Sequence, residues 1–280
     1  MSNYQGNIRK MRVATNNEHL ALYQLPIGEQ LIEMNPLIGT ELKVSFDNTI
    51  HCVHCQSLTK KSFNQGYCYR CLMKLAQCDT CIIKPELCHY DAGTCREPSW
   101  GEANCLNDHF VYLANTGTIK VGITRHVRDN VSSRWIDQGA TQAMAIMRVQ
   151  NRLTSGLVES AMKAFIADKT NWRTMLKSQP DNTDLQQLKV ELLTHIEDQL
   201  DEIIEEYGFQ AIEILDLPPV DIHYPVEQYP DKVKSINLDK DLSFSGILQG
   251  IKGQYWMLDG DRVINMRKYA GYHLNIETAD

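Results

Sequence analysis

The sequence predicts an α+β protein that is divided into a β-rich start, a cysteine-rich segment, a mixed central region and a β-rich end. Three observations lead to this prediction. All nine cysteines lie within residues 51–108. Short strand-like runs separated by turn-forming residues occupy both ends of the chain. Apolar residues at helical spacing are confined to the central region. A length of 280 residues with 43% hydrophobic content allows one large domain or two to three small ones.

The two ends of the chain are predicted to be β-structure. Residues 1–50 contain three strand-like runs separated by turns rich in Asn and Gly. Residues 209–280 contain a hairpin signal around Asp259-Gly260. Because each end is short for a domain of its own, we expect the two to pair into one small barrel that flanks the middle of the chain.

The cysteine-rich segment, residues 51–108, begins with two Cys-x2-Cys pairs separated by twelve residues. These four cysteines are Cys52, Cys55, Cys68 and Cys71. Four thiolates at this spacing suit tetrahedral zinc, and the stretch between the pairs resembles the tip of a zinc ribbon. The start of the chain has no basic region leading into an apolar one, so we expect no secretory signal and a cytoplasmic location, where thiols stay reduced.

A second metal site is predicted from the cysteines that follow. Its four candidate ligands are Cys78, Cys81, Cys88 and Cys95. Structural zinc is the favoured occupant, and an iron–sulfur cluster is the alternative because four cysteines suit both. Cys105 is left over and is expected to be a buried thiol. A four-thiolate zinc site has no open coordination position, so neither site is expected to be catalytic.

The central region, residues 109–208, reads as a mixture of strands and helices. Two strand-like runs within 110–123 surround a turn and predict a hairpin, and residues 143–149 predict a third strand. Apolar residues at helical spacing follow Ser155, which is a plausible helix cap. A longer, acidic helix is expected after residue 183.

The charge is unevenly distributed along the chain. Residues 51–180 contain 16 lysines and arginines against 10 acidic residues, whereas residues 181–280 contain 8 against 20. A positive middle in a chain of net charge −7 suggests contact with phosphate, and an ordinary solvated surface is the alternative. No stretch approaches the roughly 18 apolar residues needed for a membrane span, so no membrane association is expected.

Several residues of the central region occur in an order that resembles a known enzyme superfamily. They lie on two strand-like runs, in the segment that follows and on a helix: Tyr112, Lys120, Gly122, Arg134 and Glu159. This arrangement, within about residues 109–170, resembles the GIY-YIG endonuclease superfamily, especially the branch whose second motif reads Lys-Ile-Gly-x-Thr. The wider chain resembles a bacterial family catalogued as domain-of-unknown-function family 2797.

The superfamily resemblance implies a role for each of these residues. Tyr112 would help to deprotonate the attacking water, and Gly122 would let the backbone pass close to the scissile phosphate. Arg134 would stabilise negative charge on the phosphate, and Glu159 would bind Mg²⁺ or Mn²⁺. Lys120 replaces the tyrosine of the second motif. It could bind phosphate, or act as a base only if burial lowered its pKa well below about 10.4.

These observations favour a zinc-stabilised, nucleic-acid-processing protein, a GIY-YIG-like metal-dependent phosphodiesterase. The alternatives are a non-catalytic RNA- or DNA-binding module with zinc and a zinc-dependent protein-interaction adaptor. The spacing from Gly122 to Arg134 is a few residues longer than in the superfamily. Arg125, His126 and Arg128 lie in this interval and could take the role of Arg134. The candidate nucleic-acid contacts are Lys60, Lys61, Lys120, Gly122, Arg125, Arg128 and Arg134.

Overall fold

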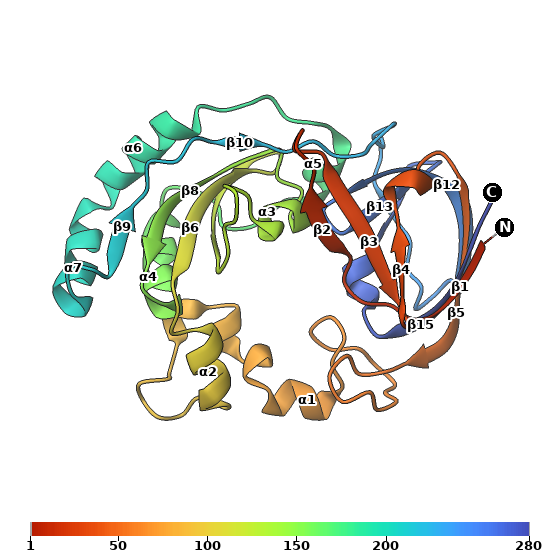
Figure 1. The fold of residues 1–280 in the computed structure, drawn as a ribbon, viewed down its shortest axis with the longest axis horizontal. Helices are drawn as coiled ribbons and strands as arrows, with labels where there is room; N and C mark the ends of the chain where they lie inside the picture. The colour runs from red at the N-terminus through yellow and green to blue at the C-terminus, as the bar shows by residue number, and fades with distance from the viewer. Residues whose placement is uncertain (1, 280) are drawn as a thin grey trace.

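The structure, a computed structural model, describes residues 2–279. These residues form a seven-stranded, a five-stranded and a three-stranded sheet. The five-stranded sheet with its helices and the seven-stranded sheet lie on opposite sides of the molecule, and the cysteine-rich segment runs between them along one edge (Figure 1). None of the helices within residues 2–279 has both the length and the apolar composition needed to cross a membrane.

The seven-stranded sheet joins the two ends of the chain. In spatial order its strands are β1 (Ser2–Asn7), β15 (Tyr272–Thr278), β5 (Glu41–Ile50), β12 (Ser243–Lys252), β13 (Tyr255–Leu258), β14 (Arg262–Asn265) and β11 (Lys234–Ser235). β15 pairs antiparallel with both β1 and β5. The two terminal segments therefore pair, as expected from the sequence.

The predicted barrel is not closed. Within residues 2–279 the sheet ends at β1 on one side and at β11 on the other, and these two strands do not pair with each other. Closure of a barrel needs edge strands of matching length and stagger. β11 has two residues and pairs only with β14, in parallel orientation, so it offers no edge along which β1 could close the sheet.

A smaller sheet packs beside the seven-stranded sheet. It consists of β2 (Arg12–Thr15), β3 (Ala21–Ile27) and β4 (Gln30–Glu33). Alternate residues of β3 and β5 are buried, as expected for strands with one face toward a core. One hydrophobic cluster contains Trp256 from the C-terminal segment, Leu25 from the N-terminal segment and Tyr112 from the central sheet. The core is thus continuous across three of the four predicted segments.

The central sheet contains the hairpin and the third strand expected from the sequence. Its strands are β7 (Ile119–Thr124), β6 (His109–Asn115), β8 (Gln142–Val149), β10 (Val220–Asp221) and, also paired with β8, β9 (Ile212–Ile214). β6 and β7 pair antiparallel, and β6 also pairs antiparallel with β8. One face of this sheet contributes to the continuous core, and the other packs against helices.

Two of the helices differ from the sequence prediction. α4 (Arg152–Met162) begins three residues before Ser155, because the side chain of Asn151 caps it by accepting a hydrogen bond from the amide of Thr154. The long acidic helix is interrupted at Ile196, whose φ of −113° and ψ of 17° are not helical. It therefore forms α6 (Leu185–His195) and α7 (Glu197–Tyr207).

The remaining helical elements are short. They are α1 (Tyr69–Lys74), α2 (Pro98–Asn104), α3 (Ser133–Asp137), α5 (Trp172–Lys177) and the 3-10 turns η1 (Asn35–Leu37), η2 (Ala76–Cys78), η3 (Thr80–Ile82), η4 (Pro85–Leu87) and η5 (Met266–Tyr269). The cysteine-rich segment consists almost entirely of such elements and loops, so its order depends on interactions other than sheet pairing.

Replacement of Ile276 by alanine tests the dependence of the fold on the C-terminal strand. Ile276 is 1% exposed and lies on β15 between β1 and β5. We expect Ile276→Ala to lower the free energy of unfolding by about 2–5 kcal/mol, because it leaves a cavity in the core. Urea unfolding measures this. Lys43→Ala, an exposed change on β5, is the control and is expected to stay within about 0.5 kcal/mol of wild type.

Candidate functional site

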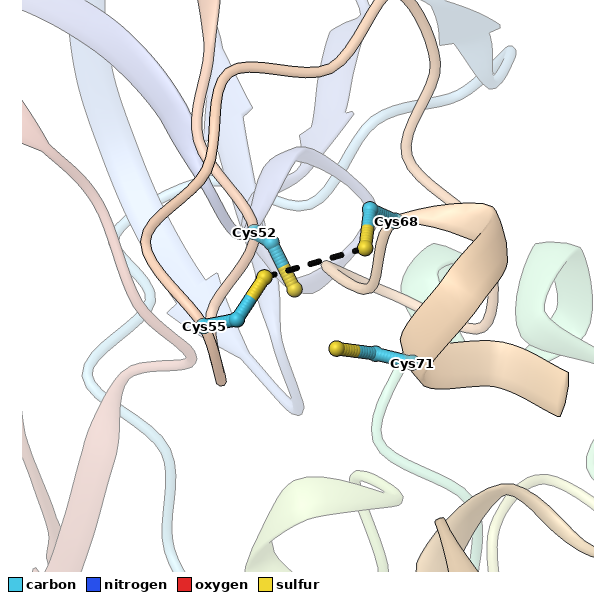
Figure 2. Close-up of side chains that lie close together, drawn as sticks. All are labelled: Cys52, Cys55, Cys68 and Cys71. Atoms are coloured by element: carbon cyan, nitrogen blue, oxygen red, sulfur yellow. Dashed lines mark hydrogen bonds between the residues drawn. The ribbon is translucent and has the colours of Figure 1, made fainter. Parts of the chain in front are cut away.

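The four cysteines of the first set converge in space. The side chains of Cys52, Cys55, Cys68 and Cys71 point toward one another (Figure 2), and their sulfur atoms all lie within 4.8 Å of one another. The Sγ atoms of Cys55 and Cys68 are 3.8 Å apart. A tetrahedral zinc ion with Zn–S bonds of about 2.3 Å separates its sulfurs by about 3.8 Å. The cluster therefore fits a structural zinc ion.

Local backbone geometry explains the convergence. Cys52 follows β5, and its carbonyl accepts a hydrogen bond from the amide of Gln56 at 3.0 Å, which closes the turn that carries Cys55. Cys68 is the N-cap of α1 and Cys71 lies in the first turn of that helix. Residues three apart on a helix lie on the same side, so both thiols face the same point. Hydrogen bonds from Ser57 lower the pKa of the Cys55 thiol to about 6.

The second set of cysteines is arranged differently. Cys78 packs against the cluster of the first set. A separate small cavity of about 20 Å³ is lined by four other cysteines, namely Cys81, Cys88, Cys95 and Cys105. At its edge, ligand atoms of Asp79, Cys81 and His89 lie within 4.8 Å of one another. Burial, and then the nearby Asp79, Cys88 and Cys105, raise the pKa of the Cys81 thiol to about 11.

A much larger pocket, of about 640 Å³, lies where the parts of the chain meet. Its walls come from all four predicted segments: Lys10, Asn64, Gln65, Tyr67, Gln77, Ile82, Ile83, Pro85, Ile123, Thr124, Arg125, His126, Ser133, Arg134, Asp137, Arg152, Glu159 and Arg267. We call this the central pocket. It contains two of the predicted catalytic residues, Arg134 and Glu159, together with Arg125.

The central pocket is rich in positive charge. Its basic side chains are Lys10, Arg125, His126, Arg134, Arg152 and Arg267, against the carboxylates of Asp137 and Glu159. Lys10 forms an ion pair with Asp137. Within residues 2–279, neither Arg134 nor Arg267 forms an ion pair with a carboxylate. Burial lowers the pKa of Arg267. The pocket therefore holds two guanidinium groups that an anion would stabilise.

Glu159 lies on α4 at the wall of this pocket. It is 9% exposed, and Lys163 Nζ lies 3.3 Å from its Oε2 atom. The same ammonium group lies 3.6 Å from Asp168 Oδ2. Burial raises the pKa of Glu159, while the charge of Lys163 opposes that shift. A carboxylate in this setting could hold a hard divalent cation together with water and ligand oxygens.

Tyr112 and Gly122 are directly opposite each other in the β6–β7 pairing. A Cβ atom at Gly122 would lie 2.5 Å from the hydroxyl oxygen of Tyr112, so the aromatic side chain occupies the space above this glycine. The Tyr112 hydroxyl donates a hydrogen bond to Gln138 Oε1 at 2.7 Å. Burial raises the pKa of Tyr112 to about 12, and the charge of Arg134 opposes this. The residue thus remains protonated at neutral pH.

Lys120 lies two residues from Gly122 on β7, and thus on the same face of the sheet. It is 3% exposed. Burial lowers its pKa to about 8, the charge of Arg134 acts in the same direction, and Glu159 and Asp168 oppose it. Lys120 could act as a base only if its pKa were well below that of a free lysine. Its lowered pKa meets this condition.

The predicted residues fall into three groups. Arg134 and Glu159 line the central pocket, whereas Tyr112 and Lys120 are buried and do not line it. The charge of Arg134 influences the pKa of both buried residues. Other predicted residues, Lys60, Lys61 and Arg128, are exposed side chains that do not line this pocket. Lys61 Nζ instead lies 5.3 Å from the centre of the Phe63 ring.

Sequence analysis missed three basic residues of the central pocket, namely Lys10, Arg152 and Arg267. Lys10 and Arg267 belong to the two ends of the chain and carry no local motif. Arg152 follows the N-cap of α4 and donates through Nη2 to the carbonyl of Ile82 at 2.5 Å. Only knowledge of the terminal strand pairing could have placed the first two near Arg134.

Comparison with known proteins gives one family match. Residues 39–274 match the family model described as Protein of unknown function (DUF2797). No curated protein and no solved structure matches the chain. The match covers the cysteine-rich segment, the central sheet and most of the C-terminal segment.

Loss of one cysteine of the first set tests the zinc assignment. We expect Cys68→Ser to lose one equivalent of zinc per chain relative to wild type, because three thiolates and a hydroxyl hold zinc far more weakly than four thiolates. Elemental analysis by mass spectrometry measures the metal content. Ser57→Ala, which removes a neighbour of Cys55 but no ligand, is the control and should retain the metal. Equal zinc content in Cys68→Ser and wild type would contradict the assignment.

Proposed function

We propose that this chain, which belongs to the DUF2797 family, binds nucleic acid in the central pocket and hydrolyses phosphodiester bonds there with the help of one divalent cation. The proposal rests on one observation: the central pocket contains both arginines that could bind a phosphate and a carboxylate that could bind a cation. Arg134 and Arg267 lack carboxylate partners within residues 2–279 and line the same walls as the carboxylate of Glu159.

The pocket chemistry supports a phosphate ligand. Five lysine and arginine side chains against two carboxylates form a local positive region in a chain of net charge −7. Basic side chains that contact phosphates supply most of the affinity for nucleic acid. The volume of about 640 Å³ lies within the roughly 300–1,000 Å³ of pockets that take small ligands, so it suits one or two nucleotides.

The arrangement of the site supports the resemblance to the GIY-YIG superfamily. Tyr112 lies on β6, Gly122 on the paired strand β7, and Glu159 on α4 after the third strand. This is the order that the resemblance implies. Arg134, at the start of α3, is near enough to Tyr112 to influence its pKa. The longer interval before Arg134 thus still allows this arginine to reach the site.

The residues of the site can be assigned to steps of hydrolysis. Arg134 and Arg267 would bind the non-bridging oxygens of the phosphate and stabilise the charge that develops on them. The neutral amine of Lys120 would accept the proton of the attacking water, oriented with the Tyr112 hydroxyl. The P–O bond to the leaving oxygen breaks, and solvent protonates that oxygen. Glu159 would hold a divalent cation, which supplies further stabilisation of negative charge.

A non-catalytic nucleic-acid-binding module is the second candidate function. Two observations favour it. Glu159 already forms an ion pair with Lys163 at 3.3 Å, which competes with a metal ion. Tyr112 is fully buried and its hydroxyl is engaged by Gln138. In this case the basic residues of the central pocket would contact phosphates and no divalent cation would be needed.

Substitution of the unpaired arginines tests binding. We expect Arg134→Ala and Arg267→Ala each to weaken binding of labelled single-stranded DNA and RNA, and to reduce the dependence of log Kd on log salt by about one phosphate contact. Fluorescence anisotropy at several salt concentrations measures both. Arg12→Ala, an exposed arginine outside the pocket, should bind as wild type does. Binding that is independent of salt would rule out phosphate recognition and leave a protein-interaction role.

The pH dependence of cleavage tests the role of Lys120. A base acts in its neutral form, and the pKa of Lys120 is about 8. Cleavage with Mg²⁺ or Mn²⁺ should therefore fall about tenfold for each pH unit below pH 8 and level off above it. Lys120→Met and Glu159→Gln should remove activity, whereas Lys240→Met, a change at an exposed lysine that does not line the pocket, should not.

Two outcomes would separate the candidate functions. A cleavage rate that does not change between pH 6 and pH 8 would exclude Lys120 as the base. Absence of cleavage by the wild type, with salt-sensitive binding intact in both wild type and Glu159→Gln, would establish the binding module instead.

A further inference from the structure

We infer that the protein holds a second structural zinc ion in the small cavity of the cysteine-rich segment. The ligands are the four cysteines that line this cavity: Cys81, Cys88, Cys95 and Cys105. This set replaces Cys78 of the sequence prediction with Cys105. It is independent of the first cluster and of the central pocket.

The segment around the cavity needs a stabilising element. Among the described residues, none of 79–108 belongs to one of the hydrophobic core clusters. The segment consists of the turns η3 and η4, the short helix α2 and loops. Short segments without a core of their own are commonly held by a metal ion or disulfides. None of the nine cysteines forms a disulfide in the structure.

The cavity has room for a single ion. Its volume of about 20 Å³ is about that of one water-sized probe. A zinc ion bound to four thiolates needs space for one atom among the sulfurs. An iron–sulfur cluster also takes four cysteines, and metal analysis distinguishes the two occupants.

Cys105 is better placed than Cys78. It is buried at the C-terminal end of α2, and its amide donates to the carbonyl of Gly101 at 2.6 Å. Cys95 approaches the same helix, since its sulfur lies 3.4 Å from the position of a Cβ atom at Gly101. Cys78 packs against the first cluster instead and does not line the cavity.

Asp79 and His89 are potential competitors as ligands, because they lie close to Cys81. Both also contact neighbouring side chains. Asp79 Oδ2 accepts an ion-pair contact from Arg96 Nε at 2.7 Å. His89 Nδ1 lies 2.7 Å from Thr94 Oγ1, and its Nε2 lies 3.4 Å from Asp79. The four-thiolate set therefore requires the thiols of Cys88, Cys95 and Cys105 to move toward Cys81 when the ion binds.

The second ion would stabilise a wall of the central pocket. The turn η4 lies between Cys81 and Cys88 in the sequence and packs closely on α4, since a Cβ atom at Gly156 would lie 2.4 Å from the amide nitrogen of Glu86. Gly156 lies one helical turn before Glu159. An ion that holds η4 in place thus also holds the surface against which the Glu159 helix packs.

Metal analysis of the full chain tests the ligand set. Wild type should contain two zinc ions per chain. Cys105→Ser should contain one, and Cys78→Ser should retain two. A wild type with a single zinc ion, or loss of zinc in Cys78→Ser with retention in Cys105→Ser, would overturn the inference. Iron with visible absorption in the wild type would likewise overturn it.

X-ray absorption at the zinc edge tests the inference without any variant that could misfold. The two sites together should give an average first shell of four sulfurs at about 2.3 Å. A first shell in which nitrogen or oxygen replaces about one eighth or more of the sulfur would show that Asp79 or His89 binds the second ion, and would contradict the four-thiolate set.

Discussion

The convergence of Cys52, Cys55, Cys68 and Cys71 is the constraint on which the rest of the architecture depends. The core around it contains little besides the cysteines and Leu75, so burial of apolar surface cannot hold this part of the chain in place. The cluster links the end of β5, in the large sheet, to α1, at the start of the path toward the central sheet. The loop between its two halves supplies Asn64 and Gln65 to the central pocket. Zinc binding would thus set the position of one pocket wall.

The pairing of the two chain ends supplies another wall. Because β15 lies between β1 and β5, residues that are far apart in sequence come together. Lys10 and Arg267 reach the pocket in this way, and Arg134 on α3 and Glu159 on α4 line it as well. The continuous core that includes Tyr112 and Trp256 holds the two sheets together. The positive pocket is therefore a product of the whole fold, although its catalytic candidates lie in one short region.

Local patterns in the sequence correctly predicted the features that are determined by residues close together in the chain. The Cys-x2-Cys spacing predicted the first cluster, and strand-like apolar runs, two of them on either side of a turn, predicted β6, β7 and β8. Of the residues grouped by the superfamily resemblance, Arg134 and Glu159 line the central pocket, and Tyr112 lies opposite Gly122 in the neighbouring strand pair. What depends on long-range packing was missed: the contribution of Lys10 and Arg267, the open sheet, and the proximity of Cys105 to Cys81. Spacing alone grouped Cys78 with the second set, whereas its side chain packs on the first cluster.

The most direct test of this account is the affinity for a labelled oligonucleotide of the zinc-loaded protein and of the same protein after zinc removal, at low salt. If the zinc cluster positions a wall of the nucleic-acid pocket, removal should weaken binding at least tenfold, and added zinc should restore it, while circular dichroism shows that the sheets persist. Equal affinity with and without zinc, at unchanged sheet content, would contradict the account.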